Sequence, residues 1–173
     1  MVLRIFRLDK RCQKILNKAK RALESGELNF SKELYEQVLQ EDPENTEALF
    51  YISEISLQGI LRQQNILITK QLGTLETIIR NLEKIKDSKN IDKYIESEVY
   101  LYLATSLFLK LKNYLPTLPL PEGMEYSLRV IDNPQPGVYN MVEKIQEYLE
   151  ISVKLNPQNK TKVLSIESRL RVI

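Results

Sequence analysis

The fold of the chain is decided by residues 12–45, CQKILNKAKRALESGELNFSKELYEQVLQEDPEN. This segment holds two stretches of apolar residues at helical spacing, separated at Gly26 and closed at Asp42-Pro43. Glycine accepts the left-handed conformation that ends a helix, and proline blocks the continuation of one. Each short helix has a single apolar face, so the hairpin cannot bury that face alone and must stack on similar units. The segment therefore predicts a helical repeat array.

The apolar spacing sets the expected helix limits. We expect one helix from about Arg11 to Glu24 and a second from about Phe30 to Gln40, and Asn45-Thr46 can start a third. The core-facing residues are Ile15, Ala19, Ala22 and Leu23 in the first helix, Leu34, Val38 and Leu39 in the second, and Ala48, Leu49, Ile52 and Ile55 in the third.

The same residues resemble the tetratricopeptide repeat, a family of helix-turn-helix units of about 34 residues. The resemblance implies an all-α fold, a superhelix of antiparallel helix pairs with a C-terminal capping helix. Lys18 departs from the family's pattern, which has a leucine at this position. With the family's late proline set on Pro43, its small positions fall on Ala19, Ala22 and Ser31, its turn glycine on Gly26, its aromatic on Tyr35, its closing apolar pair on Val38-Leu39 and its large early residue on Ile15.

A second closing signal stands before Pro157, where Ile145 and Leu149 repeat the spacing of Ser31 and Tyr35 from Pro43. The two prolines lie 114 residues apart, so we interpret the interval as two enlarged repeats. The prediction is a single helical-repeat domain, 1–173, made of a basic lead-in (1–11), repeat 1 (12–45), repeat 2 with a long second helix (46–92), repeat 3 with a Pro-rich insertion at 115–137 (93–157) and a capping helix (158–173).

The long helix of repeat 2 is inferred from a series of apolar residues that ends before Asp87. The series is either internal core or a coiled-coil seam for another chain. In repeat 3, the first helix is expected to have a core face. The residues of the series are Leu61, Ile68, Leu72, Leu75, Ile79 and Leu82, and those of the core face are Val99, Leu103, Ala104 and Leu107.

The insertion at 115–137 contains five of the chain's seven prolines and is expected to be a loop. A loop of this length in a compact domain is usually functional or disordered. Because it also carries many apolar side chains, it either packs against the domain or binds a partner itself.

Composition excludes most chemistry. The chain has no histidine and one cysteine, Cys12, so it cannot form a Ser-His-Asp triad, a His-containing metal site or a thiolate cage. Its five glycines are too far apart for a phosphate-binding loop. Carboxylate pairs such as Glu96/Glu98 are expected to be solvated, and Cys12 to be a small apolar helix residue. We predict that the protein is not an enzyme and that it has no catalytic, cofactor or metal site.

Charge is strongly segregated although the net charge is only +2. Residues 1–23 hold eight basic residues and one acidic one, whereas residues 24–60 hold nine acidic residues and one basic one. Residues 1–21 are a candidate contact for an acidic protein or an anionic membrane surface, and nucleic acid is not expected. The residues proposed for this contact are Arg4, Arg7, Lys10, Arg11 and Lys14.

The resemblance implies a scaffold or adaptor that binds a peptide or helix of another protein in its concave groove. No stretch is long enough to span a bilayer, so we expect a cytoplasmic protein. The alternative is a peripheral membrane-associated assembly factor, anchored by the basic and apolar N-terminus. In the family the first helices of each pair line the groove, which implies that the contact residues are Leu16, Lys20, Phe50, Glu54, Leu57, Leu101, Thr105 and Phe108.

Overall fold

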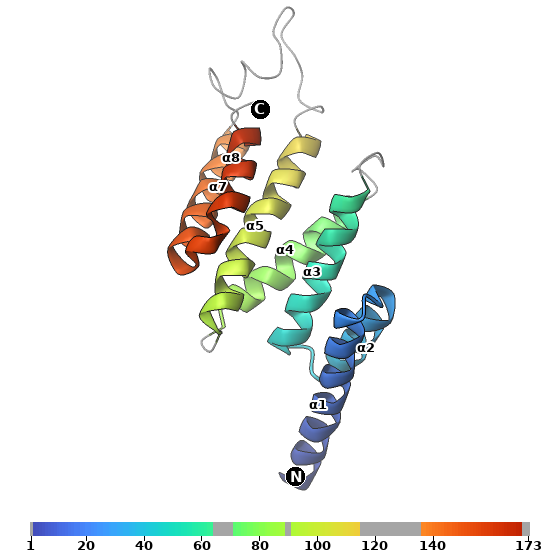
Figure 1. Cartoon of the computed structure of the whole chain (residues 1–173). Helices are drawn as coiled ribbons and strands as arrows, with labels where there is room; N and C mark the ends of the chain where they lie inside the picture. Colours follow the sequence, from blue (N-terminus) through green and yellow to red (C-terminus); the bar gives the residue numbers. More distant parts are fainter. Residues whose placement is uncertain (1, 64–70, 89–90, 115–135, 171–173) are drawn as a thin grey trace, which may run out of the picture. The chain divides into compact units, whose positions relative to one another are not determined.

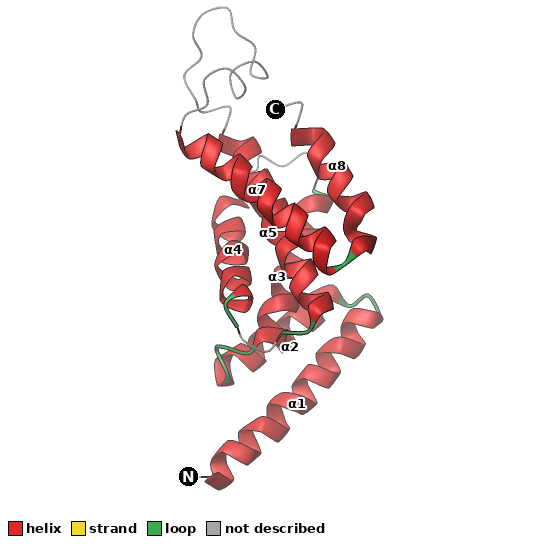
Figure 2. Ribbon diagram, turned by 90° about the vertical axis from the view of Figure 1, so that its left-hand side faces the viewer, coloured by secondary structure: helices red, strands yellow, loops and turns green. Residues whose placement is uncertain are grey.

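The structure is a computed structural model that describes residues 2–63, 71–88, 91–114 and 136–170, with the side chains of 2–9, 114, 136 and 169 left out. In these residues all regular structure is helical, with seven α-helices, one 3-10 helix and no strand (Figures 1 and 2). The predicted all-α class is therefore confirmed for the described part of the chain.

Contacts divide the chain into unit 1, Met1–Gln64, and unit 2, Asn65–Ile173. Within each unit, helices that follow one another in the sequence pack together, as in a helical repeat fold. The grouping of all repeats into one domain stays a prediction.

Unit 1 consists of α1 (Val2–Glu24), α2 (Leu28–Glu41) and α3 (Thr46–Arg62). The second and third helices lie close to their expected limits. The first begins nine residues before the expected start at Arg11, because no glycine or proline interrupts residues 2–10 and their apolar spacing continues that of the hairpin. Residues 2–11 of the basic lead-in are therefore part of α1.

Local signals end and restart the helices of unit 1 as expected. Gly26 has a φ of +80°, the only positive φ among the described residues, and it turns the chain between α1 and α2. Asn45 caps α3, because its Oδ1 accepts the backbone N–H of Ala48 at 3.0 Å.

The core of unit 1 contains small residues where α1 meets α2. Ala19 and Ser31 are fully buried, and the Ser31 hydroxyl donates to the Ala19 carbonyl at 2.9 Å. Tyr35 is also fully buried and stacks on Tyr51 of α3, with ring centroids 5.1 Å apart. Cys12 is packed in this core as expected, and its thiol also donates to Glu41 Oε2 at 3.8 Å. The cluster consists of Cys12, Leu16, Ala19, Leu34, Tyr35, Val38, Ala48, Ile52 and Ile55.

Unit 2 consists of α4 (Leu72–Lys86), α5 (Lys93–Tyr114), α7 (Pro136–Leu155), a 3-10 turn η3 (Pro157–Asn159) and α8 (Lys160–Leu170). The α5 helix is central, since it contacts α4, α7 and α8. A terminal helix, predicted as the cap of the array, is present as α8.

The core of unit 2 is formed by buried residues of α4, α5 and α7, and the central helix α5 is buried on more than one side. Ile145 and Leu149 are fully buried, as Ser31 and Tyr35 are in unit 1, so the equal spacings before the two prolines mark buried positions in both units. Its other fully buried apolar residues include Leu75, Leu82, Ile85, Val99, Leu103, Ala104 and Leu111, whereas Leu107 is half-buried.

The prediction of a long second helix in repeat 2 is wrong at the N-terminal end of that helix. The α3 helix ends at Arg62, and the N–H of Gln63 bonds to the Ile60 carbonyl, which closes the helix with a tighter turn. Leu61 therefore belongs to α3, where it is 47% exposed. Leu72, Leu75, Ile79 and Leu82 belong to α4, where Leu75 and Leu82 are internal core, and Ile68 lies outside the described residues.

The Pro-rich insertion lies outside the described residues except for its last two positions. Pro136 and Gly137 were expected in the loop, but they are the first residues of α7. Proline fits the first position of a helix because its missing N–H would have no partner there.

Two glycines of unit 1 allow a paired stability test. Gly26→Ala is expected to lower the free energy of unfolding by about 1–2 kcal/mol, because alanine resists the left-handed conformation. Gly59→Ala is expected to raise it by about 0.5–1 kcal/mol, because Gly59 lies inside α3 and an added methyl group meets nothing within 4 Å. Urea unfolding of both variants measures the two changes, and equal signs would contradict the turn geometry.

Candidate interaction site

Three of the groove residues predicted in unit 1 are apolar, and all three are buried. Leu16 is 5% exposed and belongs to the core cluster. Phe50 and Leu57 of α3 are 4% and 2% exposed, and the Phe50 ring meets the Tyr51 ring edge-on at 5.3 Å. In the described structure these side chains position helices and do not offer surface to a partner.

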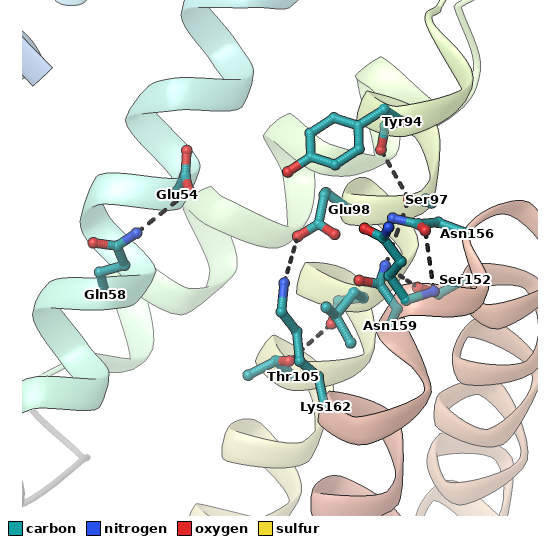
Figure 3. A network of polar contacts seen from close by, with 12 residues as sticks. Glu54, Gln58, Tyr94, Ser97, Glu98, Thr105, Ser152, Asn156, Asn159 and Lys162 are labelled. Carbon is teal, nitrogen blue, oxygen red and sulfur yellow. Dashed lines mark hydrogen bonds and ion pairs between the residues drawn. The ribbon is translucent and has the colours of Figure 1, made fainter. Parts of the chain in front are cut away.

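The two polar residues predicted there are half-buried. Lys20 Nζ lies 3.0 Å from Glu47 Oε1 of α3, an ion pair that joins α1 to α3. Glu54 accepts a hydrogen bond from Gln58 Nε2 at 3.3 Å, one turn further along α3 (Figure 3).

The remaining groove residues belong to α5 in unit 2. Leu101 and Phe108 are 3% and 4% exposed. Thr105 is half-buried, and its hydroxyl donates to the Leu101 carbonyl at 2.8 Å (Figure 3). Five of the predicted contacts thus lie in unit 1 and three in unit 2, and the groove as a whole stays a prediction.

Of the basic residues proposed for an anionic surface, Lys10 and Lys14 are exposed on α1. Arg11 is 71% exposed at its side chain, and its Nε pairs with Glu41 Oε1 of α2 at 3.2 Å. Arg4 and Arg7 lie in α1, but their side chains are outside the described residues.

A buried carboxylate in unit 2 corrects one expectation. Glu98 was predicted to be solvated with Glu96, but its side chain is 3% exposed and its Oε2 lies 3.3 Å from Lys162 Nζ of α8 (Figure 3). Its Oε1 is buried with no hydrogen-bond partner in the described structure. Helical spacing could not predict the Glu98–Lys162 pair, because the two residues are 64 positions apart.

A neutral polar contact lies next to that pair. Asn159 is 2% exposed, and its Nδ2 donates to Ser152 Oγ at 3.0 Å and to Ser97 Oγ at 3.5 Å (Figure 3). These bonds connect the 3-10 turn to α7 and α5, so they fix where α8 begins.

A polar cluster joins α4 to α7. The Tyr148 hydroxyl donates to Glu83 Oε1 at 3.0 Å, and Lys86 pairs with Glu83 Oε2. Lys86 and Lys144 lie over the Tyr148 ring at 5.6 and 5.9 Å, and the Tyr100 ring of α5 approaches it at 5.5 Å. The cluster combines the Glu83–Lys86 pair within α4 with contacts that connect α4, α5 and α7.

These contacts shift the pKa values of the cluster. Burial alone would raise the pKa of Glu83, but the hydrogen bonds from Lys86 and Tyr148 outweigh it, and the pKa falls below its ordinary value. For Lys86, burial opposes the charge, yet the hydrogen bond to Glu83 raises the pKa above the usual lysine range. Both groups are therefore held in their charged forms.

A shallow groove of about 370 Å³ lies between α7 and α8. Leu149, Val153, Val163 and Leu164 give it apolar walls, and charged residues surround them. Leu164 is 54% exposed, the largest exposure of an apolar side chain at this groove. Its lining is Leu149, Glu150, Val153, Lys154, Lys160, Val163, Leu164 and Glu167.

The described residues contain no group of three or more potential metal ligands. None of the helices described here carries an apolar run that could cross a membrane. Comparison of the chain with models of protein families, with curated proteins and with solved structures found no match in any of the three.

The Glu83 cluster generates a pH prediction. Because the pKa of Glu83 is lowered by folding, its contribution to stability is present above the ordinary carboxyl pKa and is lost as pH falls through the folded-state value. Glu83→Gln is expected to lower the free energy of unfolding by about 1–2 kcal/mol at neutral pH. The natural chain is expected to lose stability between about pH 5 and pH 3, and this loss should be smaller in the variant. Urea unfolding at several pH values measures both effects.

Glu76→Gln is the matched control on the same helix. Glu76 pairs with Lys110 at 3.4 Å, but its side chain is 62% exposed, so the expected change is within about 0.5 kcal/mol. Equal effects of the two substitutions would show that the cluster contributes no more than an exposed pair.

Proposed function

We propose that the chain is a protein-interaction scaffold of the tetratricopeptide type, which binds a peptide or helix of a partner. The observation that carries the proposal is the α1–α2 hairpin, where Ala19 and Ser31 meet and Gly26 makes the turn. These are the positions at which the family places small residues and its turn glycine. A stack of such hairpins is an architecture whose common use is to present an extended binding surface.

The scaffold proposal assigns different roles to the predicted groove residues. The buried residues Leu16 and Phe50 hold the helices in place. Lys20, Glu54 and Thr105 are half-buried, so they are the members of the set that reach a partner without unfolding of the chain. Their polar groups would orient the bound segment.

Site-specific photo-crosslinking tests this assignment. A photoreactive amino acid at Lys20, Glu54 or Thr105 is expected to capture the same partner from a lysate of the native source, because all three belong to the predicted groove. Control positions are Glu33 and Gln37, which are exposed on α2, the second helix of its pair. Mass spectrometry of the crosslinked species identifies the partner.

Capture of one partner at both sets of positions would contradict groove binding, as would capture of none at Lys20, Glu54 and Thr105. Circular dichroism of each variant confirms that it is folded before the comparison.

A second candidate function is attachment to an anionic membrane surface, in a peripheral assembly factor of the cytoplasm. It is favoured by the continuous helix α1, which begins at Val2. In such a helix Arg4, Arg7, Arg11 and Lys14 recur at steps of three and four and share one face. Basic residues next to apolar ones are typical of helices that lie on membranes.

Liposome co-sedimentation of the full chain tests this second function. Replacing Arg4, Arg7, Lys10 and Lys14 by glutamine is expected to weaken binding to vesicles containing phosphatidylserine by roughly 10²–10³-fold, because each basic residue near the surface contributes about 1 kcal/mol. Arg11 is kept because it pairs with Glu41. Pure phosphatidylcholine vesicles should bind neither protein.

The matched control removes four basic residues elsewhere and leaves α1 unchanged. If it weakens binding as much as the α1 variant does, net charge and not the α1 face explains the attraction. Its substitutions are Lys32→Gln, Lys84→Gln, Lys93→Gln and Lys112→Gln.

A further inference from the structure

The groove between α7 and α8 has an apolar floor that stays partly open. Leu149 and Val163 are 0% and 5% exposed and belong to the packing between the two helices. Val153 is half-buried and Leu164 is 54% exposed, so apolar surface remains available above that packing. A side chain from another segment could cover both residues.

The charges at the edge of this groove are sorted by sign. Lys154 stands one residue before the end of α7 and Lys160 is the first residue of α8, so both lie beside the connecting turn. Glu150 lies one turn back along α7, and Glu167 lies two turns, about 10 Å, along α8. The groove is therefore positive at the turn and negative at its other end.

These four charges are available to a partner. None of Glu150, Lys154, Lys160 and Glu167 forms an ion pair or hydrogen bond with its side chain in the described part of the chain. By contrast, Lys162 on another face of α8 is paired with Glu98. An occupant of opposite polarity could pair with all four without breaking an existing contact.

We infer that the α7–α8 groove binds an amphipathic helix of a partner protein that has an acidic group at one end and a basic group at the other. Apolar residues one turn apart on that helix would cover Val153 and Leu164, and its charges would lie opposite the two ends of the groove. The inference rests on the scaffold function proposed above and names a different surface for it.

A synthetic helix provides the probe. It is a peptide of about 14 residues with leucines at i, i+3, i+4 and i+7, two aspartates at one end and two lysines at the other. Titrated into the isotopically labelled full chain, it is expected to shift the NMR signals of the α7–α8 groove. If no shifts appear there up to about 1 mM peptide, the binding free energy is weaker than about 4 kcal/mol. That result would overturn the inference.

Charge variants test the polarity. Lys154→Glu with Lys160→Glu makes the groove negative throughout and is expected to weaken the probe about tenfold or more. Adding Glu150→Lys and Glu167→Lys reverses the polarity and should restore binding, because the helix can lie in the opposite direction. Equal affinity of all three proteins would contradict recognition by charge.

An apolar variant tests the floor. Leu164→Asp is expected to reduce probe affinity about tenfold or more, whereas Leu61→Asp, at a similarly exposed leucine of α3, should leave it unchanged. Equal losses would show that the probe binds any exposed apolar residue.

The two proposals can fail separately. If crosslinks form at Lys20 and Thr105 but the probe does not bind, the scaffold function stands and the α7–α8 inference falls. If the probe binds at α7–α8 and those positions capture nothing, the inference stands and the predicted groove falls.

Discussion

Unit 1 depends on the close approach of α1 and α2 at Ala19 and Ser31. A larger residue at either position would force the helices apart, because both side chains are fully enclosed. The serine hydroxyl brings a polar group into this contact, and the Ala19 carbonyl satisfies it. The hairpin can then present Tyr35 to α3, which covers the apolar surface that two helices alone would leave open.

Unit 2 is held by a different kind of contact. Its helices share an apolar core, but specific polar groups set their relative positions. Glu83 and Tyr148 connect α4 to α7, and Glu98 and Lys162 connect α5 to α8. Partly buried polar groups tolerate few arrangements because an unpaired partner costs free energy, so these contacts favour one packing of the helices over others of similar apolar area.

The sequence predicted local features well and distant ones poorly. The turn at Gly26 and the cap at Asn45 were predictable because each acts within a few residues. The end of α3 was not, since no glycine or proline stands between Arg62 and Leu72 to mark it. The burial of Glu98 depends on residues outside its own helix, so the spacing of residues along α5 does not reveal it. Predicted contacts such as Phe50 turned out to be buried, because α3 is apolar on more than one face and periodicity does not say which face is covered.

The paired tyrosine rings have a practical consequence for spectroscopy. The chain has no tryptophan, so its near-ultraviolet signal comes mainly from nine tyrosines. Tyr35 and Tyr51 are stacked in unit 1, whereas Tyr100 and Tyr148 meet at a tilt in unit 2. Each unit thus contains its own pair of coupled chromophores. Tyr35 and Tyr51 are the only tyrosines in the sequence of unit 1, so replacing both by phenylalanine would leave tyrosine signals from unit 2 alone, and the melting of unit 2 could be followed without any added label.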